Sequence, residues 1–265
     1  MTSERKTTSR AASADVLRRA GFNVTDESSK SMTDHIVSSF DDDLNELSDK
    51  LAEMGGLSEK LVGEAVEALI KRDIPLARRV IDWDRSIDRL QQQIEESSIR
   101  TIAKRAPVAI DLRQIIGGLR IANDLERIGD LAKNIAKRVV ALDGQFQPPK
   151  LAGGVAHIAD LTLGQLKQVL DAYTRRDDIR AVDVWNKDGE IDALYNSLFR
   201  ELLTYMMEDP RNIGFCAHLL FCAKNIERIG DHATNIAETV YYVVHGTPLN
   251  EDRPKADLMS AELGA

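Results

Sequence analysis

Long stretches of the chain place apolar residues on one side of a helix and polar residues on the other. The clearest runs from Ile121 to Val139, where apolar residues recur every three or four positions, the spacing of one α-helical face. A similar stretch runs from Ile226 to Ile236. Together with the prolines, which end a helix or occupy its first turn, this pattern predicts six long helices. We expect them near residues 33–72, 75–105, 108–142, 152–175, 177–208 and 211–245.

Two places need local signals other than proline. The join near residue 176 lacks a proline, but Asp177 or Asp178 there is a suitable N-cap, because a short acidic side chain accepts hydrogen bonds from the first helical turn. The pair Gly55–Gly56 falls within the first helix. It predicts a kink, a break or a close contact with another helix.

The second half of the chain repeats the first. Arg72-Asp73 matches Arg176-Asp177 at an offset of 104 residues, and the motif at 126–130 matches the motif at 227–231 at an offset of 101. A three-residue length change between the second and third helices explains the difference. A repeat of this length indicates one structural unit used twice. The sequence therefore predicts an all-α fold of two tandem three-helix bundles.

The repeats are expected to occupy residues 32–144 and 150–246. Residues 1–31 are rich in Ser, Thr, Arg and Lys and poor in large apolar residues, which is typical of a disordered extension. We expect this extension to be dispensable, or translation to begin at Met32. Residues 247–265 are expected to form a flexible tail.

Composition fits closely packed helices and disfavours nucleic-acid and membrane partners. Apolar residues make up 43% of the chain and aromatics only 5%, so Ala, Leu, Ile and Val dominate the core. The net charge of -8 repels nucleic acid and anionic membrane surfaces. The chain contains no apolar run long enough to span a membrane, and we expect no secretory signal because the first residues lack its apolar core. Cys216 and Cys222 are expected to be buried free thiols, which fits the cytoplasm.

Acidic residues four positions apart recur at matching places in both repeats. Side chains at i and i+4 are neighbours on a helix, where two like charges cost roughly 0.2–0.5 kcal/mol. Carboxylates from two adjacent helices could hold a hard cation or a cluster of iron, manganese, magnesium or zinc ions. The candidate metal ligands are Asp84, Asp88, Glu126, Asp130, Asp188, Asp192, Glu227 and Asp231.

The alternative is a solvated acidic face with Arg127 and Arg228 nearby. Glu126 and Asp130 lie opposite the apolar stripe of their helix. The row that they form therefore faces either solvent or a shallow groove beside the helix that carries Asp84.

More specific metal and catalytic motifs do not fit. Gly129 stands where a di-iron Glu-x-x-His motif needs histidine, and Ile87 stands where an EF-hand loop starting at Asp82 needs glycine. His232 follows Asp231 directly and so points about 100° away from it. The sequence contains neither a phosphate-binding glycine loop nor a paired nucleophile and base. We therefore expect a protein that is not an enzyme.

The segments Asp-Leu-Glu-Arg-Ile-Gly-Asp at 124–130 and Asn-Ile-Glu-Arg-Ile-Gly-Asp at 225–231 resemble the paired signature of the PhoU family. Asp111-Leu112-Arg113 and the Met-Met-Glu-Asp-Pro run at 206–210 are also similar to that family. The resemblance covers residues from about Met32 to about Gly246. It implies two three-helix bundles that bind metal clusters through the eight acidic residues given above.

The resemblance also implies a function. PhoU-like proteins are cytoplasmic, often homodimeric, negative regulators of the phosphate-starvation response and of high-affinity phosphate uptake. They contact the ATPase subunit of a phosphate ABC transporter and a phosphate-sensing histidine kinase. The residues themselves leave two alternatives open, a metal-buffering protein and a structural helical protein, both without a signalling role.

Overall fold

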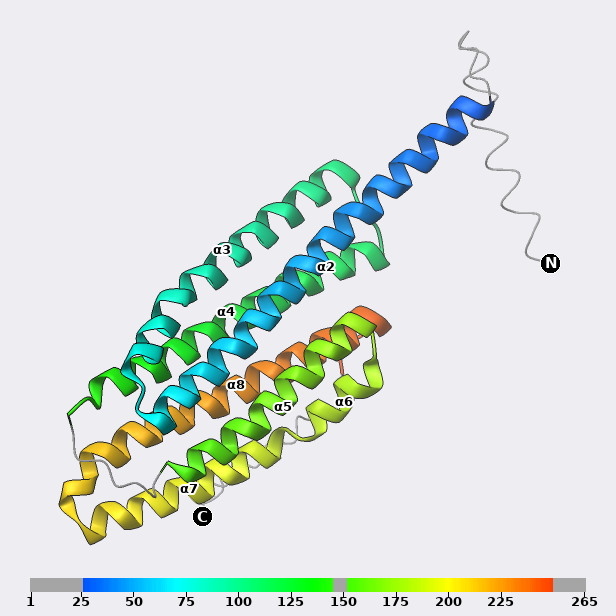
Figure 1. The fold of residues 1–265 in the computed structure, drawn as a ribbon. Coiled ribbons are helices and arrows are strands. Elements are labelled where there is room, and N and C mark those ends of the chain that lie inside the picture. Colours follow the sequence, from blue (N-terminus) through cyan, green and yellow to red (C-terminus); the bar gives the residue numbers. More distant parts are fainter. Residues whose placement is uncertain (1–25, 145–151, 250–265) are drawn as a thin grey trace. The chain divides into compact units, whose positions relative to one another are not determined.

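The computed structural model describes residues 26–144 and 152–249, with side chains from residue 40 onward within these ranges. Helices dominate both ranges and no strand forms within them (Figure 1), which confirms the all-α fold class. The elements are α2 (Asp26–Lys71), α3 (Ile74–Arg105), α4 (Ile110–Ala141), α5 (Gly153–Arg175), α6 (Asp178–Asn186), α7 (Asp188–Glu208), the 3-10 helix η1 (Pro210–Asn212) and α8 (Ile213–His245).

The first helix begins earlier than the sequence pattern predicted. Helix α2 starts at Asp26, so the end of the expected disordered extension, 1–31, is helical. Residues 26–32 contain neither proline nor glycine and open with two acidic residues, which favour a helix N-terminus. The rest of that extension, the join at 145–151 and the expected tail from residue 250 lie outside the described residues.

Most of both repeats lies in one compact unit, whose described residues begin at Glu46; the start of α2, up to Asn45, belongs to a separate unit. Within the larger unit, α2, α3 and α4 form the first repeat, and α5 to α8 form the second (Figure 1). Helices α4 and α8 pack extensively against each other. The apolar stripes that begin at Ile121 on α4 and at Ile226 on α8 are buried, as their spacing predicted.

The turn before the second helix has the same form in both repeats. Arg72 and Arg176 have φ values of 58° and 53°, in the left-handed region that residues other than glycine seldom adopt. The next residue caps the helix, since the side chain of Asp73 accepts a hydrogen bond from the backbone N–H of Leu76 and Asp177 caps α6 in the same way. Asp177 is therefore confirmed as an N-cap.

The helix expected over 177–208 is interrupted. Helix α6 ends at Asn186 and α7 begins at Asp188, whereas α3 in the first repeat runs without interruption. The second repeat has Gly189 where the first has Arg85, and glycine weakens a helix interior. The backbone carbonyl of Lys187 accepts a hydrogen bond of 3.1 Å from the side chain of Gln165 on α5.

Helix α2 continues through Gly55–Gly56, so the expected break does not occur there. A Cβ atom at Gly55 would lie 3.1 Å from a methyl group of Leu170 on α5. A larger side chain there would require the Leu170 side chain to shift by a few tenths of an ångström, which fits the expectation of a close helix contact. No helix within 26–144 and 152–249 combines the length and apolar character that a membrane crossing requires.

Candidate functional site: two carboxylate clusters

The eight candidate ligands form two clusters, each across a pair of packed helices. The first cluster joins α3 to α4 and contains Asp84, Asp88, Glu126 and Asp130. The second cluster joins α7 to α8 and contains Asp188, Asp192, Glu227 and Asp231. Each helix pair is in direct contact, so the structure brings together the acidic pairs that the repeat pattern matched.

A glycine, which has no side chain, lets the two helices approach closely beside each cluster. A Cβ atom at Gly129 would lie 2.7 Å from Cδ1 of Ile87, and one at Gly230 would lie 2.7 Å from Cδ1 of Ile191. Real Cβ atoms essentially never make contacts this short. Each glycine precedes the second acid of its motif, so the same contact positions both clusters.

Three of the eight acids are buried, whereas Asp88 is exposed. Asp84 and Asp188 are each only 4% exposed, and Glu227 is 9% exposed. Burial raises the pKa of Glu227, although Lys224 partly opposes that shift. Burial and then the charge of Asp84 raise the pKa of Asp88. These carboxylates lose solvation on folding, and a nearby cation would stabilise their charged forms.

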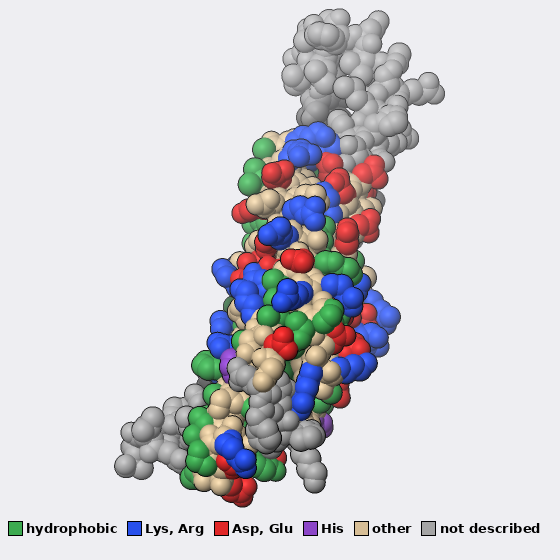
Figure 2. Space-filling view, turned by 60° about the vertical axis from the view of Figure 1, so that its left-hand side comes forward, with side chains coloured by type: hydrophobic (Ala, Val, Ile, Leu, Met, Phe, Trp, Pro, Cys, Tyr) green, Lys and Arg blue, Asp and Glu red, His purple; other side chains and the backbone are tan. Residues whose placement is uncertain are grey.

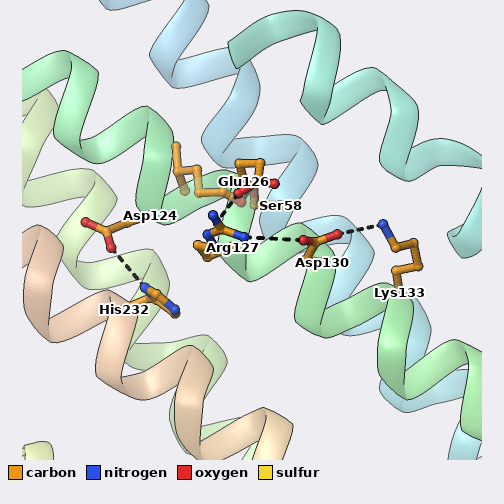
Figure 3. Close-up of polar contacts among 8 residues, drawn as sticks. Ser58, Asp124, Glu126, Arg127, Asp130, Lys133 and His232 are labelled. Atoms are coloured by element: carbon orange, nitrogen blue, oxygen red, sulfur yellow. Dashed lines mark hydrogen bonds and ion pairs between the residues drawn. The ribbon is translucent and has the colours of Figure 1, made fainter. Parts of the chain in front are cut away.

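Positive side chains already neutralise the first cluster in part. The Lys133 ammonium donates hydrogen bonds to Asp84 and, at 2.6 Å, to Asp130. The Arg127 guanidinium lies 3.3 Å from Glu126 and 3.8 Å from Asp130. Figure 3 shows Asp130 between these two cations. Partial burial opposes the charge on Lys133, but its two carboxylate partners outweigh burial and raise its pKa.

The second cluster is built differently. Thr234 donates a hydrogen bond of 2.8 Å to Asp188, and Lys224 donates one of 2.7 Å to Oε1 of Glu227. The other oxygen of Glu227, Oε2, is buried and has no hydrogen-bond partner among the described residues. A buried carboxylate oxygen without a partner is costly, so a ligand that contacts this atom would be favoured.

Over the part of the chain whose side chains are described, no three carboxylate, imidazole or thiolate groups converge closely enough to hold a metal ion as they stand. The two clusters differ in their partners. In the first cluster the Lys133 ammonium bridges Asp84 on α3 and Asp130 on α4, whereas in the second cluster one oxygen of Glu227 has no hydrogen-bond partner among the described residues.

Sequence reasoning missed Lys133 and Thr234, which contact the buried acid of their clusters. Lys133 lies one turn after Asp130, and the 101-residue offset pairs it with Thr234, so the repeat comparison could have found both.

His232 contacts an acid outside the clusters. Its Nδ1 atom lies 2.9 Å from Oδ1 of Asp124, so the pair links α8 to α4 (Figure 3). Both side chains are largely buried in this contact between the repeats. His232 is therefore placed as a residue that joins the two bundles.

The outer surface carries charges of both signs. Figure 2 shows one face of the molecule, on which Lys and Arg side chains are interspersed with Asp and Glu side chains. Apolar side chains are also exposed at corresponding ends of the two repeats. Val108, between α3 and α4, is 75% exposed, and Met207, at the end of α7, is 78% exposed.

Both repeats match the same protein family. A family description named PhoU domain matches residues 51–139 and again residues 155–240. The phosphate-specific transport system accessory protein PhoU homolog of Rhizobium meliloti is 58% identical, over 85% of this chain and 95% of that protein. The protein of the same description from Caulobacter vibrioides (strain NA1000 / CB15N) is 48% identical, over 86% of this chain and all of that protein.

Solved structures show the same fold. The crystal structure of PhoU from Pseudomonas aeruginosa matches with a TM-score of 0.75 at 41% identity, covering 78% of this chain and all of that chain. The phosphate transport system regulatory protein PhoU from Streptococcus pneumoniae matches with a TM-score of 0.73 at 29% identity, covering 80% of this chain and all of that chain.

Proposed function

We propose that this chain, which belongs to the PhoU family, is an accessory protein of a phosphate-specific transport system. The relatives from Rhizobium meliloti and Caulobacter vibrioides that carry this description match almost over their whole length. The structural relative from Streptococcus pneumoniae is described as a regulatory protein of phosphate transport. These descriptions support an accessory or regulatory role rather than catalysis.

More specifically, the protein is a cytoplasmic negative regulator of the phosphate-starvation response and of high-affinity phosphate uptake. It acts as an adaptor between the ATPase subunit of the transporter and a phosphate-sensing histidine kinase, and it forms a homodimer. The observation that carries the adaptor role is the pairing of two equivalent bundles in one compact unit. Such a unit offers two similar surfaces, as bridging two partners requires.

The exposed ends of the bundles support this role. Val108 and Ile110 lie at the α3–α4 end of the first repeat, and Met207 and Ile213 lie at the matching end of the second. Exposed apolar side chains are common on protein surfaces, but the same exposure at equivalent places suits recognition of protein partners.

Metal binding at the two carboxylate clusters belongs to the same proposal. Asp, Glu and hydroxyl oxygens are ligands of magnesium, manganese and iron, and carboxylates also bind zinc. The unpaired Oε2 atom of Glu227 supports a cation in the second cluster. It also favours a second candidate function, in which the chain buffers metal ions without a signalling partner.

Affinity purification separates the two functions. The tagged full-length protein is recovered from phosphate-replete and phosphate-starved cells, and its partners are identified by mass spectrometry. Recovery of the transporter ATPase and a histidine kinase supports the adaptor role. Absence of both under both conditions, with metal bound to the purified protein, would support metal buffering instead.

A further inference from the structure

A groove runs along the seam between α4 of the first repeat and α8 of the second. It consists of two adjoining hollows, both of which are lined by Arg120 of α4 and by Glu238 and Thr239 of α8. One hollow continues along the helices to Asn123 and Asn235. Because α4 and α8 pack directly against each other, this groove lies between the two repeats.

Contacts between helices hold the walls of the groove in place. The Arg120 guanidinium lies 5.1 Å from the centre of the Tyr242 ring, a distance typical of a cation–π contact. The indole N–H of Trp185 on α6 donates a hydrogen bond of 3.0 Å to Glu238. The groove is therefore a formed surface, with charged groups at fixed positions along it.

The repeat-related part of the seam is occupied by an arginine side chain. The offset of 101 residues relates Arg120 to Phe221 and Arg138 to Thr239. The Arg138 guanidinium lies over the Phe221 ring, 4.3 Å from its centre. Thr239 is much shorter than Arg138, so the seam beside Arg120 has room for another part of the chain.

The C-terminal segment enters this groove directly after α8. Gly246 ends the helix with a φ of 77°, a left-handed conformation that lets the chain reverse its direction. A Cβ atom at Gly246 would lie 3.1 Å from Cζ of Arg113 on α4, so the glycine also lets the chain pass close to α4. Pro248 and Leu249 then line the same hollow as Arg120, and Leu249 is partly buried.

We infer that the groove is the docking site of the chain's own C-terminal segment, residues 247–265. Tyr242 and Asn235 lie two helical turns apart on α8, which is about 10 Å. An extended chain covers about 3.3 Å per residue, so the residues after Leu249 are more than sufficient to reach the far end of the groove. They include apolar side chains that the groove would shield from water, namely Leu258, Met259 and Leu263.

A docked segment joins the two repeats and closes the groove. It contacts α4 and α8 at once, so a partner that uses the groove must first displace it. Docking within one chain requires neither a metal ion nor the transport partners proposed above. Purified protein therefore tests it separately from the proposed function.

Disulfide trapping in the full-length protein measures where the segment lies. One cysteine is introduced by Asn123→Cys, at an exposed position that lines the groove. The other is introduced at one of three segment positions, Asp252, Ala256 or Leu258. The matched control replaces Asn123→Cys by Lys137→Cys, at an exposed position of α4 outside the groove. The two native cysteines are buried and should not interfere.

For at least one segment position, we expect oxidation to join the segment to Asn123→Cys at least about tenfold faster than to Lys137→Cys, because docking raises the local concentration of the thiol. Adding Leu249→Ser should remove this preference, since it withdraws an apolar side chain from the groove. Val244→Ser changes an exposed residue of α8 outside the groove and should leave the preference unchanged.

Three results would overturn the inference. One is equal trapping at both α4 cysteines for all three segment positions, in proteins whose circular dichroism and thermal unfolding match the wild type. Another is trapping that gives only covalent dimers on non-reducing gels, which would assign the groove to the segment of a second copy. The third is a preference that Leu249→Ser leaves unchanged, since the segment would then not be held through the hollow beside Arg120.

Discussion

The Cδ1 atom of Ile87 lies 2.7 Å from the place that a Cβ atom would take at Gly129, and the contact recurs between Ile191 and Gly230. This close approach joins the middle helix to the last helix of each repeat beside its carboxylate cluster. The glycine is thus required by packing, and it sets how near the acids of the two helices come.

Adding a methyl group at this contact should destabilise the protein. Alanine normally stabilises a helix interior by about 1 kcal/mol relative to glycine. Overpacking a core costs about 1–3 kcal/mol. Because Ile87 is fully buried, we expect Gly129→Ala to lower the free energy of unfolding by about 1 kcal/mol in urea titrations.

A matched substitution serves as the control. Gly63 also lies within a helix, but nothing comes within 4 Å of a Cβ atom there. Gly63→Ala should stabilise the protein by about 0.5–1 kcal/mol. Adding Ile87→Val to Gly129→Ala should recover part of the lost free energy of unfolding. If Gly129→Ala were as stabilising as Gly63→Ala, the close packing would be disproved.

The pair of Asp124 and His232 should help to hold the two bundles together. Its equivalent under the repeat is Asn225 and Leu131, so the contact exists once. Removal of one member leaves a largely buried polar group unpaired, at a cost of about 1–3 kcal/mol. We expect Asp124→Ala and His232→Ala each to destabilise the protein. A double-mutant cycle should show coupling above about 0.5 kcal/mol, and additive losses would contradict a direct interaction.

Both cysteines should resist thiol reagents in the native protein. Cys216 and Cys222 are free and fully buried. Burial raises the pKa of Cys222 to about 12, which keeps the thiolate, the reactive form, scarce at pH 8. Reaction with a chromogenic disulfide should be slow in buffer and reach two thiols per chain in denaturant. Rapid reaction of Cys222 without unfolding would contradict its burial.

Metal binding should depend on the acids and leave the fold intact. We expect the fourfold variant with Ala at Glu126, Asp130, Glu227 and Asp231 to lose tight binding of a transition metal while its helix content stays nearly unchanged. The core stripe of each helix lies on other residues, so the fold does not depend on these acids. Elemental analysis and circular dichroism measure the two properties. Metal retained by this variant would place the site elsewhere.

The sequence was sufficient to predict the helices and the repeat because both leave periodic signals. Apolar spacing marked the buried stripe from Ile121, and the offset of 104 residues matched Asp73 with Asp177, both of which cap a helix. The break at Lys187 was not predicted; Gly189 beside it weakens the helix locally, and the hydrogen bond to the carbonyl of Lys187 comes from Gln165, which is distant in sequence. The early start of α2 escaped because the prediction relied on apolar residues, which are sparse there.

The candidate site was predicted less completely than the fold. The eight acids could be found because they are duplicated, and the structure places them in two clusters. The inequality of the clusters depends on which side chain contacts Asp84 and Asp188, and spacing along one helix does not show contacts to another helix. The contact of His232 with Asp124 was missed for the same reason.

A reporter of phosphate-starvation genes in cells grown with abundant phosphate tests the regulatory proposal most directly. Deleting the gene for this chain should switch the reporter on, and supplying the intact gene in trans should switch it off again. Phosphate uptake measured in the same cultures should rise with the deletion. If the reporter stays off and uptake stays normal in the deletion strain, the chain is not a negative regulator of phosphate uptake and signalling.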